Sequence, residues 1–439
     1  MPAENWDDIR PYVVNLTEGK LSTTGSFQMA INSLSEIFDD HLPEYMKECE
    51  KNKTTPRLMF FAHGGLVSET VALGITRHHS AWWRANGIYP LYFVWETGPF
   101  ETIFSMLGER QPDGVQFGFK EKLEEMKDAI KDAAQDVADS ASQFLARKLG
   151  GPAIWAQMKE WPPASIQANF GSDQVVRRLA TFLKAHPTIE LHAAGHSAGA
   201  IFHAYFLPHA LAAIAESGGK TFKSLHLLAP AITVADFESL LGPKLGGGID
   251  FTRIYTMNDR AEKDDNCVHL YLKSLLYLIY YSLEPETETP LLGLERSLSD
   301  NERSDLLRRT FRLDGARSEL GQVLFTPHKN KLPDQRQLEN RTGSTSHGGF
   351  DDDPSTMNSI AHFLLNKAPD VPFTQADSKL KEKPVYALHT RESLAQSTED
   401  ELEGGTPQGL TFGDSPVTID NTRAVRLAVL DLVESVLEG

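Results

Sequence analysis

The chain has 439 residues, of which 41% are hydrophobic and 23% charged, and its formal net charge at pH 7 is −17. This composition is typical of a soluble globular protein, and its charge argues against a broad surface for nucleic acid or anionic membranes. The two cysteines, Cys49 and Cys267, exclude a disulfide framework and suit a reducing compartment. Residues 1–10 lack a signal-peptide pattern and the most apolar later run, 270–283, is too short to span a bilayer, so we expect a cytoplasmic protein without a transmembrane segment.

The N-terminal part of the chain predicts a hairpin, helices and two buried strands. Residues 12–17 and 20–24 flank Glu18-Gly19, which favours a hairpin, and Ser26 is placed to cap a following helix. Two continuous apolar runs then have the length of strands that are buried on both faces of a parallel sheet. They enclose a further helix, so that the order is residues 57–62, a helix that carries His78, His79, Trp82 and Trp83, and residues 88–95.

Between residues 96 and 171 the alternation of strands and helices lapses. Residues 119–149 contain no proline and carry one narrow apolar stripe, which predicts a long amphipathic helix. We expect residues 99–171 to form a helical cap or insertion above the sheet. It serves either as a lid that gates a substrate pocket or as a structural helix pair packed on the core or on another subunit.

Alternation then resumes. The expected strands are the apolar run that begins at residue 189 and leads into Gly195–Gly199, and residues 224–228, 252–257 and 322–326. The expected helices are 173–185 with Ser172 as its cap, 200–215, 234–241, 270–283 and 354–365. Strands that alternate with helices predict an α/β fold with a mainly parallel sheet flanked by helices. We expect residues 1–371 to form this domain and residues 372–439 a polar C-terminal arm. The arm ends in an amphipathic helix, 424–437, that could meet a protein partner or a second copy.

The strongest motif is Gly195-His196-Ser197-Ala198-Gly199, which lies between a strand pattern and a helix pattern. A G-x-S-x-G sequence in this setting presents its serine as a nucleophile on a strained turn. The glycines two residues before and after the serine come so close together that neither tolerates a side chain. Ser197 is therefore the predicted nucleophile.

A serine hydroxyl needs a base to take its proton, and the base needs a carboxylate to orient it. With this order of elements, the histidine is expected after the last strand. His347 lies there in a loop, flanked by Gly348 and Gly349, and just before a helix that Asp353 can cap with Pro354 at its first position. His347 is the predicted base and His328 is the reserve.

The orienting carboxylate is expected in the loop after residues 252–257, which contains four acidic residues: Asp259, Glu262, Asp264 and Asp265. The carboxylate must lie a few residues beyond the end of the strand, in a loop held by the next helix. Asp264 and Asp265 are better placed than the other two, and Asp265 is the first choice. All four remain open at this point.

Two main-chain N–H groups should face the oxyanion of a tetrahedral intermediate. Ala198, next to the nucleophile, supplies one. The other is expected in the loop His63-Gly64-Gly65-Leu66, from Gly65 or, second, from Leu66, because Gly64 and Gly65 leave the backbone free to approach a substrate. We expect His63 to brace this loop by hydrogen bonding.

Taken together, the His63-Gly64-Gly65 loop, the Gly195–Gly199 motif, the acidic loop 259–265 and His347 resemble the α/β-hydrolase superfamily, in its esterase and lipase branch. The resemblance covers residues 57–367, and residues 274–278 and 347–354 are similar to uncharacterised bacterial members. It implies an α/β-hydrolase fold and a cofactor-free serine hydrolase without a metal. Ser197, His347 and Asp265 or Asp264 would form the triad, with Gly65 and Ala198 in the oxyanion hole and Gly64 and His196 supporting it.

The leading hypothesis is therefore a carboxylesterase or lipase-like enzyme that cleaves a carboxylic ester through an acyl-enzyme, with an acyl or lipid-like substrate favoured by the apolar insertion. A second hypothesis is a catalytically silent scaffold on a hydrolase fold. A third is an effector esterase held in check by a protein partner through the insertion.

Overall fold

The computed structural model describes residues 5–65, 68–95, 150–215, 220–265, 273–300, 303–327 and 336–374, with single positions at 139, 143, 146, 147, 267 and 271. It also describes two short strands, β9 (Thr411–Phe412) and β10 (Ser415–Pro416), which pair antiparallel. The predicted helix over 119–149, apart from four of those positions, and the predicted terminal helix over 424–437 lie outside the described residues.

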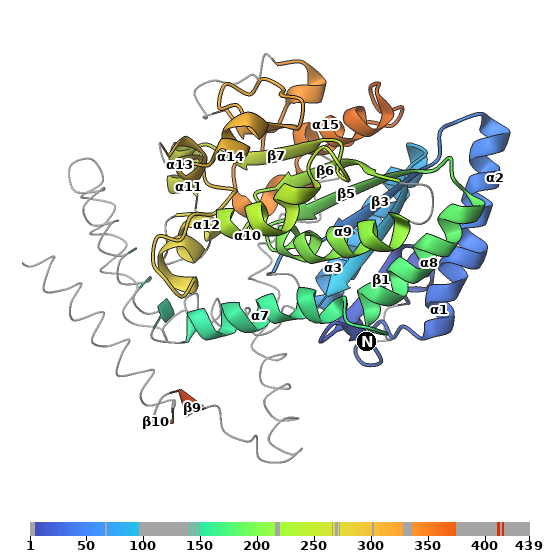
Figure 1. Cartoon of the computed structure of the whole chain (residues 1–439), viewed down its shortest axis with the longest axis horizontal. Coiled ribbons are helices and arrows are strands. Elements are labelled where there is room, and N and C mark those ends of the chain that lie inside the picture. Colours follow the sequence, from blue (N-terminus) through green and yellow to red (C-terminus); the bar gives the residue numbers. More distant parts are fainter. Residues whose placement is uncertain are drawn as a thin grey trace, which may run out of the picture.

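An eight-stranded sheet organises the main body, in the order β2-β1-β4-β3-β5-β6-β7-β8 (Figure 1). All neighbouring pairs are parallel except β1 and β2, which form the predicted hairpin. The strands are β1 (Val13–Thr17), β2 (Lys20–Leu21), β3 (Arg57–Ala62), β4 (Tyr89–Trp95), β5 (Glu190–His196), β6 (Phe222–Leu228), β7 (Thr252–Met257) and β8 (Gly321–Thr326). The prediction of an α/β fold with a mainly parallel sheet is confirmed.

Helices cover both faces of this sheet. The α-helices of the described residues are α1 (Ile31–Glu36), α2 (Leu42–Asn52), α3 (Glu69–Ala85), α7 (Gly151–Ser165), α8 (Gly171–Ala185), α9 (Gly199–Ile214), α10 (Val234–Asp236), α11 (Asp259–Lys263), α12 (Leu275–Leu278), α13 (Glu295–Ser299), α14 (Asp305–Thr310) and α15 (Pro354–Leu365). Between them lie the 3-10 helices η1 (Asp7–Tyr12), η5 (Gly242–Lys244), η8 (Leu338–Asn340) and η9 (His347–Asp352), and the π-helical turns η2 (Ile37–His41), η4 (Phe237–Leu241) and η6 (Ile279–Leu283).

Alternate residues of the central strands face different helices. Phe60 of β3 and Phe93 of β4 contact Phe206 of α9. On the opposite face, the ring of Tyr92 contacts Phe61, and its hydroxyl accepts a hydrogen bond from Trp83 of α3. Because the strands are buried on both faces, they read as continuous apolar runs in the sequence.

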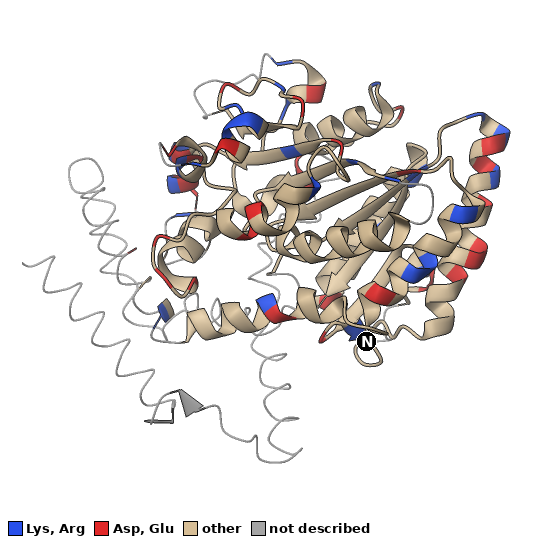
Figure 2. Cartoon of the chain, viewed as in Figure 1, with Lys and Arg blue, Asp and Glu red and all other residues tan. Residues whose placement is uncertain are grey.

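Charged residues are concentrated on the outer helices and loops, while the strands of the sheet carry few (Figure 2). Helix α9 has no Asp, Glu, Lys or Arg, and ten of its sixteen residues are buried, as expected for a helix packed against the core. Among the described residues, no helix combines the length and apolarity that crossing a membrane requires.

Three predicted helix starts are wrong. Ser26 does not cap a helix, because its N–H and hydroxyl both donate to Glu69 at 2.9 Å, and the helix begins only at Ile31. Ser172 is not a cap either, since α8 already begins at Gly171. The predicted helix over 270–283 begins at Leu275, where the hydroxyl of Ser274 accepts from the N–H of Tyr277. In the first and third cases side-chain hydrogen bonds set the boundary.

The main body extends slightly past the predicted boundary at residue 371. Phe373 is buried against Trp82 of α3, and its main chain exchanges two hydrogen bonds of 2.8 Å with Asn358 of α15. Of the predicted insertion, α7 is described, and it packs against α8, α9 and η6.

Candidate active site

Ser197 lies on the sharp turn between β5 and α9, with φ = +52°, a left-handed conformation that is strained for a residue with a side chain. The prediction that its flanking glycines are crowded is confirmed. A Cβ on Gly195 would lie 2.8 Å from the main chain of Gly199, and a Cβ on Gly199 would overlap the carbonyl oxygen of Ala62. The turn therefore places Ser197 at the end of the strand and leaves no room for side chains at the two glycine positions.

The position of this turn in the sheet also favours a binding site. The chain passes from β3 to β4 on one side and then returns to β5 on the other side of β3. Ligands of open parallel sheets bind at such a switch point, outside the carboxyl ends of the strands. Ser197 follows the carboxyl end of β5, and the His63–Gly65 segment follows that of β3.

His347 reaches Ser197 from the far end of the chain. It is the first residue of η9, and its Nε2 lies 2.8 Å from the hydroxyl oxygen of Ser197. Both residues are buried, and burial is the main cause that lowers the pKa of His347 well below its usual value. A neutral imidazole within hydrogen-bonding distance of a serine hydroxyl can accept its proton.

The reserve histidine, His328, lies outside the described residues. Asp353 caps α15 as predicted: its Oδ2 accepts from the N–H of Thr356 at 2.7 Å and from the N–H of Gly343 at 2.8 Å. Pro354 is the first residue of the helix. This cap follows η9 directly and anchors the segment that carries His347.

The four acidic candidates of the 259–265 loop have different positions. Asp265 is buried, and its Oδ2 accepts a 2.8 Å hydrogen bond from the main-chain N–H of His347. Asp264 is exposed. Asp259 binds Lys263 and the hydroxyl of Tyr277, and Glu262 is fully buried, which raises its pKa well above the usual value. Of the four, Asp265 hydrogen-bonds His347, and it does so through the main chain. Among the described residues, Nδ1 of the His347 ring has no hydrogen-bond partner.

One acidic residue near the base was not predicted. Asp351 follows His347 by four residues in η9, is almost fully buried, and has its Oδ2 3.6 Å from Nδ1 of His196. Its negative charge acts to raise the pKa of both His63 and His347. The available signal was the run Asp351-Asp352-Asp353, which begins four residues after the candidate base. The sequence alone does not show that Asp351 and Asp352 are buried while Asp353 caps a helix.

The predicted oxyanion segments lie beside each other. A Cβ on Gly65 would be 3.2 Å from Cβ of Ala198, and a Cβ on Gly64 would be 3.2 Å from Cβ of Ser197. Ala198 immediately precedes α9, a sixteen-residue helix whose first N–H groups lack partners within the helix and attract negative charge. Leu66, the second choice for a donor, lies outside the described residues.

His63 braces the loop that follows β3, as expected. Its Nε2 accepts from the N–H of Trp95 at 3.1 Å, and its Nδ1 donates to the carbonyl of Gly64 at 2.7 Å. The Trp95 indole N–H returns a 3.2 Å bond to the carbonyl of His63. Burial lowers the pKa of His63 to about 4, so the ring is neutral and holds the loop by hydrogen bonds alone.

Helix α7 of the insertion lies close to the same loop. A Cβ on Gly65 would be 2.8 Å from the sulfur of Met158, so the Met158 side chain rests on the predicted oxyanion segment. Met158 and Trp155 of this helix are buried. An apolar side chain of α7 thus lies against the segment that follows β3.

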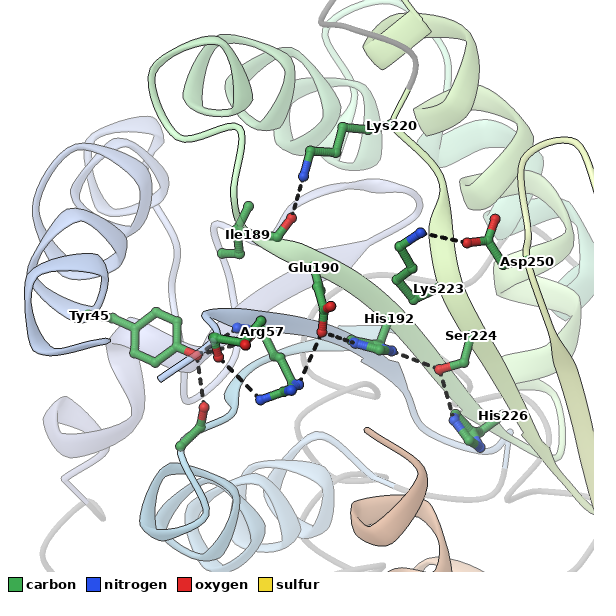
Figure 3. A network of polar contacts seen from close by, with 12 residues as sticks. Tyr45, Arg57, Ile189, Glu190, His192, Lys220, Lys223, Ser224, His226 and Asp250 are labelled. Carbon is green, nitrogen blue, oxygen red and sulfur yellow. Dashed lines mark hydrogen bonds and ion pairs between the residues drawn. The ribbon is translucent and has the colours of Figure 1, made fainter. Parts of the chain in front are cut away.

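Other histidines have structural roles. His203 donates to the carbonyl of Ala194 at 2.7 Å from within α9. His192 and His226 lie in a buried network in which both bond the hydroxyl of Ser224, at 2.8 and 2.9 Å, and which extends through Glu190 to Arg57 (Figure 3). The network begins at the amino ends of β3 and β5, away from Ser197. It therefore stabilises the sheet rather than the site.

No family model, no curated protein and no solved structure matches this chain. Within the described ranges, no three histidine, cysteine, aspartate or glutamate side chains are grouped so as to hold a metal ion.

Proposed function

We propose that the protein is a serine hydrolase of the α/β-hydrolase type that cleaves a carboxylic ester through an acyl-enzyme. The observation that carries the proposal is the 2.8 Å contact between the hydroxyl of Ser197 and Nε2 of His347. It joins a serine held at φ = +52° to a histidine 150 residues away in the sequence. A purely structural serine would not need the strained turn, the excluded side chains at Gly195 and Gly199, and a neutral buried imidazole at once.

In the proposed reaction, the oxygen of Ser197 attacks the ester carbonyl while its proton passes to Nε2 of His347. The N–H groups of Ala198 and Gly65 stabilise the negative charge on the carbonyl oxygen. His347 then gives its proton to the departing alcohol, which leaves an acyl group on Ser197. Water attacks the acyl group, again with His347 as base, and releases the carboxylic acid and the free serine.

Asp265 is the proposed orienting acid. Its bond to the main-chain N–H of His347 holds the base in position, and its buried negative charge favours the imidazolium that forms during the reaction. The apolar side chain of Met158, which lies against Gly65, supports an acyl rather than a strongly polar acid portion of the substrate.

A fluorophosphonate probe tests the nucleophile. We expect the wild-type protein to be labelled and Ser197→Ala to give no labelling, because the probe reacts with an activated serine. A panel of p-nitrophenyl esters of rising acyl length, with the same variant beside it, measures turnover and chain preference. Equal labelling of both proteins, or no turnover of any ester, would favour the alternative of a catalytically silent scaffold.

A further inference from the structure

The main chain of His347 is held on both sides by buried side chains. Its N–H donates to Asp265, and its carbonyl accepts a 2.8 Å hydrogen bond from Nε2 of His196. His196 is the last residue of β5 and directly precedes Ser197. The strand that presents the serine is therefore also hydrogen-bonded to the segment that carries His347. The two imidazole rings have centroids 5.5 Å apart.

The bond to the carbonyl determines where His196 carries a proton. A carbonyl oxygen only accepts, so Nε2 of His196 must be protonated. Its other nitrogen, Nδ1, is 3.6 Å from Oδ2 of Asp351, which is an ion-pair distance rather than a hydrogen bond. Both side chains are almost fully buried. This distance places the buried carboxylate of Asp351 directly beside the ring of His196.

We propose that His196 and Asp351 form a positioning pair that holds the base loop against the nucleophile turn. Both residues also act electrostatically on His347. This inference rests on the proposed function. It assigns a role to the residue before the serine in the G-x-S-x-G motif and to an aspartate outside the predicted triad.

The sign of the electrostatic effect follows from the groups around His347. Those that face it are His196 from β5, Asp351 from η9 and Asp265 from the loop after α11, while His63 after β3 lies in the same charge cluster. After burial, His196 is the largest influence that lowers the pKa of His347, and Asp351 acts to raise it. Removing His196 alone should therefore raise the pKa of His347, and removing Asp351 as well should bring it down again.

The pH dependence of fluorophosphonate labelling measures this without knowledge of the substrate. The rate falls at acid pH as His347 becomes protonated. In His196→Gln, whose amide N–H can still donate to the carbonyl of His347, we expect this acid limb to move to higher pH with most of the plateau rate retained. In the double variant His196→Gln/Asp351→Asn, we expect the acid limb to return to lower pH. His196→Phe, which has no donor, should lower the plateau rate about 10- to 100-fold.

His203→Gln and His203→Phe are the matched controls. His203 also donates from a buried ring to a main-chain carbonyl, but to that of Ala194, and no contact joins it to His347. These variants should keep the wild-type acid limb. If the acid limb of His196→Gln also stays at the wild-type pH, or if His196→Phe retains the wild-type plateau rate, the proposal of a positioning pair is wrong. The hydrolase proposal is unaffected by either result.

Nitrogen NMR of labelled histidines in the full-length wild-type protein provides a test independent of activity. Nε2 of His196 should remain protonated from about pH 5 to pH 9, and the ring signals of His196 should change in Asp351→Asn. An unprotonated Nε2 in this range would contradict the proposal even if the His196 variants did not fold. Absence of labelling in wild type, by contrast, would count against the hydrolase proposal and leave this measurement valid.

Discussion

Gly199 illustrates how closely the site is packed at the scale of single residues. It begins α9 two residues after Ser197, and its Cα faces the carbonyl of Ala62 in β3. The main chain of a central strand cannot move aside in the way that the end of a flexible side chain can. The position therefore demands glycine for space, although its φ angle is not left-handed.

We expect Gly199→Ala to destabilise the protein by about 3 kcal/mol, at the upper end of the usual cost of overpacking, and to reduce labelling of Ser197. Denaturant unfolding and fluorophosphonate labelling measure the two effects. Gly348→Ala is the control, because Gly348 adjoins His347 but has open space where a Cβ would lie. Equal stabilities of the two variants would show that the turn tolerates a methyl group.

At the scale of elements, the attachment of α7 to the rest of the molecule is the main feature. Glu284, which follows η6, accepts from the indole of Trp155 at 2.6 Å and binds Lys159 through both carboxylate oxygens, at 2.8 and 2.7 Å. Its side chain is only 4% exposed. Arg147 adds bonds to the carbonyls of Ser282 and Glu284. One buried carboxylate thus fastens the helix whose Met158 rests on Gly65.

Glu284→Gln should lower the free energy of unfolding by about 2 kcal/mol, because it leaves the Lys159 ammonium without its negatively charged partner while the new amide oxygen can still accept from Trp155. Asp250→Asn, which breaks the exposed pair with Lys223, is the control and should cost about 0–1 kcal/mol. If α7 is a lid, labelling of Ser197 by bulky probes should also become faster in Glu284→Gln. An unchanged labelling rate would support the structural alternative.

At the scale of the whole molecule, the buried histidines make stability depend on pH. Burial is the main cause that lowers the pKa of all five members of this set: His63, His192, His203, His226 and His347. The folded state then disfavours their protonation, whereas the unfolded chain takes up protons near pH 6.5. The stability associated with neutral rings is present above pH 6.5 and is lost as the pH falls towards the folded values, which are about 4 for His63 and His203.

Urea unfolding should therefore give its highest stability near pH 7, with a loss of several kcal/mol between pH 6.5 and pH 4.5. A single shift of the size seen at His203 corresponds to roughly 3 kcal/mol once the pH lies below both values. The contribution of Glu262 to the pH dependence has the opposite sign, since burial raises its pKa. We expect the five histidines together to outweigh this single carboxyl group. A variant without the His203 ring should show a smaller acid loss than wild type. Constant stability over this range would contradict the prediction.

Local patterns in the sequence predicted much of the fold. The buried strands, the hairpin, the Asp353 cap and the Ser197 turn each depend on neighbouring residues, whose spacing and chemistry are visible in the chain itself. The helix starts at Ser26 and Ser172 were wrong. Ser26 shows the physical reason. Instead of capping a helix, its N–H and hydroxyl donate to Glu69, which lies far away in the sequence.

The sequence by itself determined the type of sheet, the strained serine turn and the small set of residues able to act with it, because these follow from periodicity, glycine spacing and side-chain chemistry. Only the tertiary structure decided which of four acids meets His347, that His196 grips its carbonyl, and that Asp351 lies beside both. Those choices depend on how segments 82 to 155 residues apart pack together. Burial also changes the energy of a charge far more than any local pattern can reveal.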